Sequence, residues 1–542
     1  MVKLRIGIGL ALSALLLLGA KCGGGDGDSG GRMIIQMEYI DPRCVPIAGQ
    51  FPSGFGMVPG AEGQGAAVQF SPAGLVALDL NTVPPSPLAE EGIPHLPTDS
   101  DGDGIADGRR SLEVEGCRIP DYDPEDCPYL PVPVMGGVLV VSESLALVSA
   151  SDYEEVIFFE LPSGELTQLQ VGNADGDHPY LPEALELRTA VSTRVCVYPP
   201  QPAVDSLGDA IDPERLCDPS SPSYLTSFTA GKAVVEVGEG SALFVATSNV
   251  ERASQARFNP GTVLVYTIEE TEGGLAISPD PEVPAIFTEG FNPTAVATYT
   301  AHPAAQAREL VLVTTTGAIG QGTGADNIET GGAVEVIDAA SRGLVARIPL
   351  GLAGPAFAEL VVVPGQRMAL LGATSQRRVY AVDLTPLDDP ALYQRPAGEV
   401  VSLDGTQPPF PDARIYWADS PFEIPARADG PDPRVCAGQT SVAVNVDQTR
   451  VFVTDFCDGT LSVLDIVSEG DVSGERLELA RVENALAPNT AASVGELRAP
   501  GLVRVRSGIP GLDYTGPDVF FVAGLPEGQV CGVRIESFAP LP

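Results

Sequence analysis

An acidic stretch near the amino end has the residue types and spacing that bind a hard cation. In TDSDGDGIADG, residues 98–108, aspartates alternate with small residues, and Gly104 stands at the position of a sharp turn. Several carboxylates and one main-chain carbonyl can then converge on a calcium ion. The alternative is a solvated acidic turn, whose mutually repelling carboxylates would lack a counter-ion. The predicted ligands are the carboxylates of Asp99, Asp101, Asp103 and Asp107 and the carbonyl of Ile105.

This stretch resembles the calcium loops of thrombospondin type 3 repeats and, over its first nine positions, an EF-hand loop. It departs from the EF-hand at the twelfth position, where Arg110 replaces the bidentate glutamate, and no helical pattern flanks it. The resemblance therefore implies a structural calcium ion as the cofactor.

The elements that must position such a site are short apolar runs that recur in pairs. Both faces of each run are apolar, as expected of a strand whose sheet is covered on both sides. Two of the second runs begin at Val334 and Val379, 45 positions apart, which matches the roughly 40–45 residues of a four-stranded blade. The pairs are 66–80, 145–151 with 155–161, 243–249 with 262–268, 310–316 with 333–338, 368–374 with 378–384, 451–456 with 460–466, and 519–524 with 529–535.

Repetition of a unit that cannot bury its own faces predicts an all-β chain, a seven-bladed β-propeller with long loop insertions. The alternative is an array of β-sandwiches, which do not normally repeat one hairpin in this way.

Residues 441–466 resemble the YVTN-type propeller repeat. Residues 452–455, Phe-Val-Thr-Asp, stand where that family has its named tetrapeptide, and Asp465 closes the following strand. Residues 333–351 are similar to the third and fourth strands of the same repeat. The resemblance implies the fold. Because some proteins of this group resemble lactone hydrolases, it also leaves a lactonase-like hydrolase acting in the central channel as the alternative function.

The first residues have the pattern of an export signal. A basic start and an apolar run of signal-peptide length occupy 1–21, before Cys22 and a Gly-rich stretch that ends at 32. This order resembles a bacterial lipoprotein, which implies an exported chain anchored to the outer membrane through lipid on Cys22, on its surface or periplasmic side. Lys21 departs from the small residue that the family has before its cysteine.

The cysteine count fits an exported, lipidated chain. Nine cysteines are present, an odd number that normally leaves one thiol over in a secreted protein. Lipidation of Cys22 leaves eight, which we expect to form disulfides. The alternative is buried free thiols. Nearness in sequence and blade geometry favour the pairs Cys117 with Cys127, Cys196 with Cys217, Cys436 with Cys457, and Cys44 with Cys531.

The last apolar pair leaves no residues for a fourth strand, so another segment must cover that edge. We expect residues 33–40 to lie antiparallel on 529–537 and to close a propeller that spans 33–542. The tether would then leave from the rim opposite the one that carries Cys436 and Cys457.

Three long insertions interrupt the repeats, at 81–135, 172–230 and 405–440. We expect 172–230 and 405–440 to connect blades, and with the excursions 250–261 and 317–332 to share the rim that faces away from the membrane. Loops gathered on a rigid scaffold are where binding usually occurs. The predicted function is therefore a binding or scaffold module for a protein or carbohydrate partner. Neutral insertion at surface turns is the alternative.

The charge excludes some partners. The formal net charge is −41, and removing residues 1–21 makes it −44, with Lys232 as the only remaining lysine. Such a surface repels nucleic acid and anionic lipid, so the lipid anchor is the only membrane contact we expect. The chain is predicted to be a monomer. No HExxH, GxSxG, GxxxxGK[ST] or CxxC motif is present, so no catalytic residue is assigned.

Overall fold

The structure of the chain, a computed structural model, describes mainly its strands and the turns between them. The described residues are 34–35, 38–39, 43–46, 50–57, 65–71, 74–79, 86–87, 137–142, 145–150, 155–160, 187–192, 225–238, 240–251, 258–271, 274–303, 306–315, 332–350, 357–373, 378–396, 398–403, 422–423, 426–427, 440–445, 447–455, 460–468, 475–484, 500–506, 518–523 and 529–534.

Seven sheets of four or five strands, each antiparallel in its main part, make up this described chain. A separate two-stranded pairing joins β1 (Ile34–Ile35) to β26 (Ala426–Arg427). Sheet 1 holds β4 (Gln50–Met57), β5 (Gly65–Ser71), β6 (Gly74–Asp79) and β7 (Ser86–Pro87). Sheet 2 holds β8 (Val138–Ser142), β9 (Leu145–Ala150), β10 (Glu155–Glu160) and β11 (Leu187–Ser192). Sheet 3 holds β12 (Leu225–Val237), β13 (Gly240–Glu251), β14 (Phe258–Thr271), β15 (Gly274–Pro279) and β16 (Ala285–Phe291).

The other four sheets follow in chain order. Sheet 4 holds β17 (Pro293–Ala301), β18 (Arg308–Thr315), β19 (Ala333–Asp338), β20 (Gly343–Pro349) and β24 (Val401–Ser402). Sheet 5 holds β21 (Phe357–Val363), β22 (Met368–Ala373), β23 (Arg378–Asp383) and β25 (Phe422–Glu423). Sheet 6 holds β27 (Thr440–Val444), β28 (Arg450–Asp455), β29 (Thr460–Ser468), β30 (Glu475–Asn484) and β2 (Glu38–Tyr39). Sheet 7 holds β31 (Pro500–Arg506), β32 (Asp518–Ala523), β33 (Gln529–Arg534) and β3 (Arg43–Pro46).

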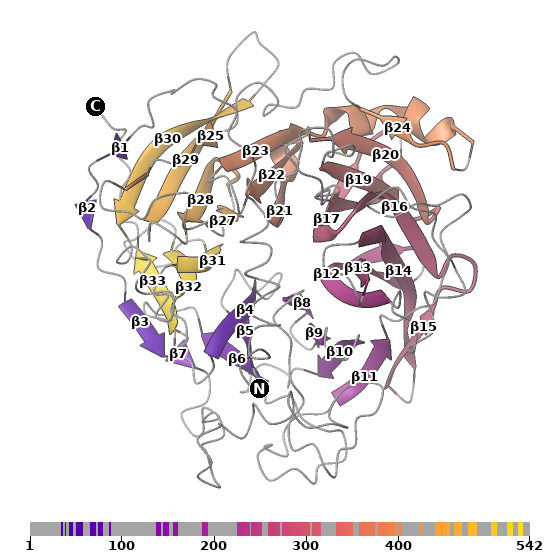
Figure 1. Cartoon of the computed structure of the whole chain (residues 1–542), viewed down its shortest axis with the longest axis horizontal. Helices are drawn as coiled ribbons and strands as arrows, with labels where there is room; N and C mark the ends of the chain where they lie inside the picture. The colour runs from indigo at the N-terminus through magenta and orange to yellow at the C-terminus, as the bar shows by residue number, and fades with distance from the viewer. Residues whose placement is uncertain are drawn as a thin grey trace, which may run out of the picture.

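The sheets are arranged around a common centre, with their first strands innermost (Figure 1). Neighbouring inner strands contact one another in the order β4, β8, β12, β17, β21, β27 and β31, and β31 contacts β4 again. Separate antiparallel sheets stacked radially in this way define a β-propeller. The predictions of an all-β chain and of a propeller are confirmed.

Each predicted pair of apolar runs forms the second and third strands of one sheet. These strands are apolar on both faces because every sheet packs against a neighbour on each side. Buried clusters accordingly span adjacent sheets, as Phe244 of sheet 3 with Val311 of sheet 4, and Leu370 of sheet 5 with Val453 of sheet 6. The repeat seen in the sequence is therefore the middle of each sheet.

Alternating strand direction divides the connections between two rims. We call the side with the second-to-third-strand turns and the connections between sheets the link rim. The opposite side, with the first-to-second-strand and third-to-fourth-strand turns, is the turn rim. The strand ends joined by 302–307 and by 339–342 lie on the turn rim, and those joined by 316–332 lie on the link rim.

The prediction that residues 33–40 complete the last sheet is wrong. That place is taken by β3, which pairs antiparallel with β33. Instead, β1 pairs with β26, and β2 lies parallel to the end of β30 with Tyr39 opposite Asn484. Only residues 47–49 separate β3 from β4 of sheet 1, and β4 contacts β31 of sheet 7. Placing β3 on sheet 7 therefore closes only a short loop and costs little entropy. The described amino-terminal strands thus lie toward the link rim, not the opposite one as predicted.

Two stretches that the sequence predicts to connect blades each contain a strand of a sheet. β11 lies inside 172–230 and pairs with β10, and β25 lies inside 405–440 and pairs with β23. Residues 161–186 consequently join a third strand to a fourth strand and begin at the turn rim. The expectation that the long insertions share one rim therefore holds only in part.

Candidate functional site

The interface between sheets 2 and 3 contains a buried cation. Lys232 on β12 donates from Nζ to the carbonyl of Gly137 at 2.6 Å and to Oγ of Ser149 at 2.7 Å. The residue is only 6% exposed, and burial lowers the pKa of its amine to about 7. Gly137 stands just before β8, at the end of the connection that carries residues 98–108. Lys232 therefore ties the end of that connection to the ring.

The interface between sheets 3 and 4 contains a buried anion at the link rim. Glu335 of β19 is fully buried, and its carboxylate accepts the main-chain N–H groups of Glu289 at 2.8 Å and Gly290 at 2.6 Å, both on β16. Arg347 Nε lies 3.9 Å from Oε1. Burial raises the pKa of Glu335 to about 7, although the two N–H donors and the guanidinium oppose the rise.

The segment of β16 that hydrogen-bonds Glu335 is tightly packed against sheet 4. A Cβ on Gly290 would stand 2.3 Å from Thr315 Oγ1 and 3.0 Å from Glu335 Oε1, so only glycine fits there. Thr288 donates to the carbonyls of Gly261 and Gly290 at 3.1 and 2.7 Å. The end of β16 is therefore fixed against sheet 4 by side chains from both sheets.

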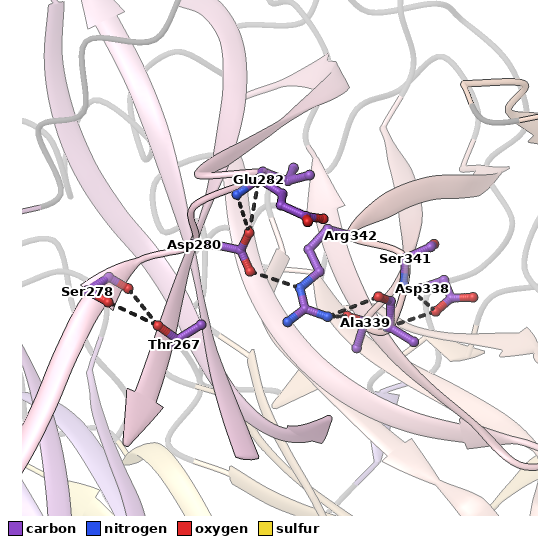
Figure 2. A network of polar contacts seen from close by, with 10 residues as sticks. Thr267, Ser278, Asp280, Glu282, Asp338, Ala339, Ser341 and Arg342 are labelled. Atoms are coloured by element: carbon purple, nitrogen blue, oxygen red, sulfur yellow. Dashed lines mark hydrogen bonds and ion pairs between the residues drawn. The ribbon is translucent and has the colours of Figure 1, made fainter. Parts of the chain in front are cut away.

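The same two sheets are joined at the turn rim by an ion pair (Figure 2). Asp280 Oδ1 accepts the N–H groups of Glu282 and Val283 at 3.0 and 2.9 Å, and Oδ2 lies 3.3 Å from Arg342 Nε. Arg342 also donates to the carbonyl of Ala339 at 2.9 Å. Burial raises the pKa of Asp280, but the N–H donors and the guanidinium outweigh it and hold the pKa below its ordinary value.

Sheet 4 is held to sheet 5 by the segment that leaves β23. It contains the 3₁₀ helices η4 (Thr385–Asp388) and η5 (Pro390–Gln394), and it ends in β24 on sheet 4. Arg308 of β18 stacks 4.9 Å above the ring of Tyr393 and bonds Asp338 at 2.7 Å. Asp388 accepts the main-chain N–H of His302 at 2.7 Å.

Sheets 5 and 6 are joined by a third carboxylate. Glu359 of β21 accepts from Ser441 Oγ at 2.5 Å and from the N–H of Val442 at 3.2 Å, both on β27. At the turn rim, Gly365 N donates to Gln448 Oε1 at 2.5 Å. Within the part of the chain that the structure describes, the charged residues inside the ring mainly join one sheet to the next.

Most of the site residues predicted from the sequence lie outside the described residues. These are the calcium ligands Asp99, Asp101, Asp103, Ile105 and Asp107, the lipidation site Cys22, and the cysteines at 117, 127, 196, 217, 436 and 457. The exceptions are Cys44 and Cys531, which are direct register partners on β3 and β33. Cys531 is fully buried and disulfide-bonded.

The described residues bring together no group of three or more His, Cys, Asp or Glu side chains that could hold a metal ion. His302 is the one histidine among them, and it is exposed in the β17–β18 turn, on the turn rim. Among these same residues, no helix has the length and apolarity to cross a bilayer.

Sequence reasoning did not single out the two buried ions, Lys232 and Glu335. For Glu335 a signal existed, since it is the one charged residue before the closing aspartate of the apolar run 333–338. An acid in a strand that is covered on both faces must be buried. For Lys232 the sequence shows only that it is the sole lysine after residue 21.

The fold and these contacts define the class of protein: a β-propeller whose described sheets are joined by buried and half-buried polar groups. No family model matches the chain, and no curated protein matches it.

Solved structures with a similar course of the chain are propellers or enzymes of distant sequence. The Cps50 (Swd1) β-propeller domain of Myceliophteria thermophila is 11% identical, over 91% of this chain and 99% of its own, with a TM-score of 0.42. Hydrazine synthase of Kuenenia stuttgartiensis is 10% identical, over 94% and 99%, with a TM-score of 0.44. A putative 6-phosphogluconolactonase of Bacteroides uniformis is 10% identical, over 81% and 86%, with a TM-score of 0.40.

Proposed function

We propose that this chain is an exported, lipid-anchored β-propeller that holds a protein or carbohydrate partner on its link rim. The observation that carries the proposal is the ring of inner strands, a rigid support whose sheets are joined by long connections. The connections 88–136, 193–224 and 316–332 all begin and end at the link rim. Their clustering favours that rim as the binding face.

The leader and Cys22 support the membrane anchor. Residues 23–33 separate Cys22 from β1, and such a linker reaches at most about 3.5 Å per residue. Because β1 and β2 lie toward the link rim, the anchor and the partner would share one side of the ring. The partner is therefore expected close to the outer-membrane surface.

We infer that the ring has seven blades and that a disulfide bond closes it. β3 completes sheet 7, and Cys44 stands directly opposite the disulfide-bonded Cys531. Opposed residues in antiparallel strands have Cα atoms about 4.5–5.5 Å apart, within the range that a disulfide spans. We assign Cys44 as the partner of Cys531. Peptide mapping without reduction should recover the two residues in one linked fragment, and linkage of either to another cysteine would refute the pairing.

Calcium at residues 99–107 is the second structural support that we infer. The connection 88–136 that carries this stretch begins after β7 in sheet 1 and ends at Gly137, which Lys232 holds. A calcium ion there would order the connection between two neighbouring sheets. Isothermal titration with calcium should detect binding that the double variant D101N/D103N loses. Equal binding by that variant would place calcium elsewhere.

The partner site is tested by shortening one connection on each rim. Replacing 194–223 with a short Gly-Ser linker removes a link-rim connection. The matched control replaces 163–184 on the turn rim in the same way. Both leave the strands of sheets 2 and 3 in place.

Crosslinking on intact cells, followed by affinity capture, should recover the partner with wild type and with the turn-rim control but not with the link-rim variant. Retention of the partner by the link-rim variant and loss by the control would reverse the assignment of the face. Fatty-acid labelling, with C22S as the unlabelled control, tests the anchor independently of the partner.

A further inference from the structure

Two buried hydroxyl groups at the link rim of sheet 6 have no hydrogen-bond partner. They are Thr460 Oγ1 and Ser462 Oγ, both on β29, and both residues are fully buried. Because successive side chains of a strand point to opposite faces, residues two apart point the same way. The two hydroxyls therefore stand side by side on one face of the sheet.

That face is turned toward sheet 5. Ser462 is the register partner of Val453, which packs in the apolar cluster shared by sheets 5 and 6. Asp455 is the register partner of Thr460 and is also fully buried, so a carboxylate shares the face with the hydroxyls. On sheet 5, Leu370 belongs to the same cluster, and Gly372 follows it on the same face of β22. Glu359, the register partner of Gly372, reaches across this end of the interface to Ser441 and Val442.

Buried hydroxyls without partners are unusual in native proteins, and an ordered water or ion is one explanation for them. Each unpaired hydroxyl weakens the fold by the hydration it has lost. Two of them beside a carboxylate form a donor set made only of oxygen, which suits a hard cation and not zinc or copper. Calcium accepts such irregular sets, with carbonyl oxygens and water completing its shell.

We propose that the interface between sheets 5 and 6 encloses a calcium ion held by Thr460, Ser462 and Asp455. The site is separate from residues 99–107 and does not depend on the proposed partner. It would place a cation beside the carboxylate of Asp455 and join two neighbouring sheets at the link rim. The ion would act at this interface in addition to the Glu359 contacts with Ser441 and Val442.

The test measures calcium in a chain whose other predicted site is disabled. Mature protein carrying D101N/D103N is dialysed against calcium and analysed by plasma mass spectrometry and thermal unfolding. A single calcium ion per chain should remain, and calcium should raise the unfolding temperature. Adding T460V/S462A should abolish both the bound ion and the temperature shift. Absence of calcium in the D101N/D103N protein, or its persistence after T460V/S462A, would overturn the proposal.

A matched control separates lost binding from changed packing. Thr229 Oγ1 in sheet 3 is likewise buried without a hydrogen bond, but no second unpaired hydroxyl accompanies it among the described residues. T229V should keep the calcium and unfold at the same or a higher temperature. If T460V also raised the unfolding temperature, the hydroxyls of sheet 6 would be empty and the proposal wrong. T460S keeps the hydroxyl and should retain the ion, which covers the case of a variant that fails to fold.

Discussion

The interfaces on the two sides of sheet 3 each contain one buried ionisable side chain, basic on one side and acidic on the other. Lys232 stands in the interface with sheet 2, and Glu335 stands in the interface with sheet 4. Burial moves their pKa values toward each other, down to about 7 for the amine and up to about 7 for the carboxyl. In both places the neutral form is favoured because a charge loses its hydration inside the ring.

The two residues differ in their hydrogen-bond partners. Lys232 donates to a carbonyl at the end of a long connection and to a serine hydroxyl, whereas Glu335 accepts two N–H groups of β16, which is tightly packed at Gly290. One ion therefore anchors a connection, and the other anchors a sheet. Two buried residues with similar pKa values can therefore have different structural roles.

The largest effect that we expect comes from Lys232→Ala. The substitution leaves a cavity and removes a donor from the Gly137 carbonyl, which together should lower the free energy of unfolding by about 4 kcal/mol. Lys232→Met keeps the volume without the charge and should lose clearly less. Chemical denaturation of both variants measures the difference. Equal losses would show that the charge, not the packing, holds this interface.

The pH dependence of stability should separate the two interfaces. Glu335 has an ordinary pKa of 4.5 and a folded pKa of about 7, so its folded state binds the extra proton between these values. Stability from this group is present below pH 4.5 and is lost as pH rises to 7. Lys232 has an ordinary pKa of 10.5 and a folded pKa of about 7, so its unfolded state binds the extra proton between them. Stability therefore recovers as pH rises from 7 toward 10.5.

Two variants isolate these opposite slopes. Relative to wild type, E335Q should remove a fall on the order of 3 kcal/mol between pH 4.5 and 7, and K232M should remove the rise at higher pH. Unfolding free energies from denaturant titrations across that range measure both. A wild-type curve with the reverse slopes would contradict the assignment of these groups.

A smaller effect is expected at the other end of the interface between sheets 3 and 4. Arg342→Ala removes the ion pair with Asp280, whose side chains are 18% and 8% exposed, and should lower stability by about 1 kcal/mol. Arg342 has a left-handed φ of 52°, so Arg342→Gly relieves backbone strain while it removes the same pair. Thermal unfolding should therefore rank wild type above Arg342→Gly, and Arg342→Gly above Arg342→Ala.

The smallest effect should come from Arg450 and Asp465 in sheet 6. This pair lies 2.9 Å apart with side chains 29% and 39% exposed, where solvent screens the charges. Arg450→Ala should change stability by less than about 0.5 kcal/mol, and added salt should erase the difference. A loss as large as that of Lys232→Ala would mean that this exposed ion pair contributes as much to stability as the buried amine.

The sequence predicted the middle of every sheet and, through residues 333–351, the fourth strand of sheet 4, but not the outer strands of the other sheets. The second and third strands are long and apolar on both faces, so their pattern is strong wherever they occur. Outer strands such as β7, β25 and β3 are two to four residues long, and no periodicity can be read in so few residues. For the same reason the apolar pattern favours residues 33–40 for the last sheet, although β3 occupies that place.

The candidate sites divide in a similar way. Calcium ligands leave a trace in residue type and spacing, so the sequence predicts residues 99–107 as ligands, and that stays a prediction. The pair Cys44 with Cys531 was expected from closure of the last blade, and the two residues are register partners. Lys232, Glu335, Thr460 and Ser462 leave almost none, because their chemistry comes from burial beside a neighbouring sheet.

The sequence by itself determined that this chain stacks strands whose two faces must both be covered, since apolar residues on both faces exclude a solvated sheet. Only the tertiary structure decided which strand completes the last sheet, toward which rim the first described strands lie, and which charged side chains are buried. Those outcomes depend on a few main-chain hydrogen bonds, on loop length and on contacts between residues far apart along the chain, and none of these is encoded in local spacing.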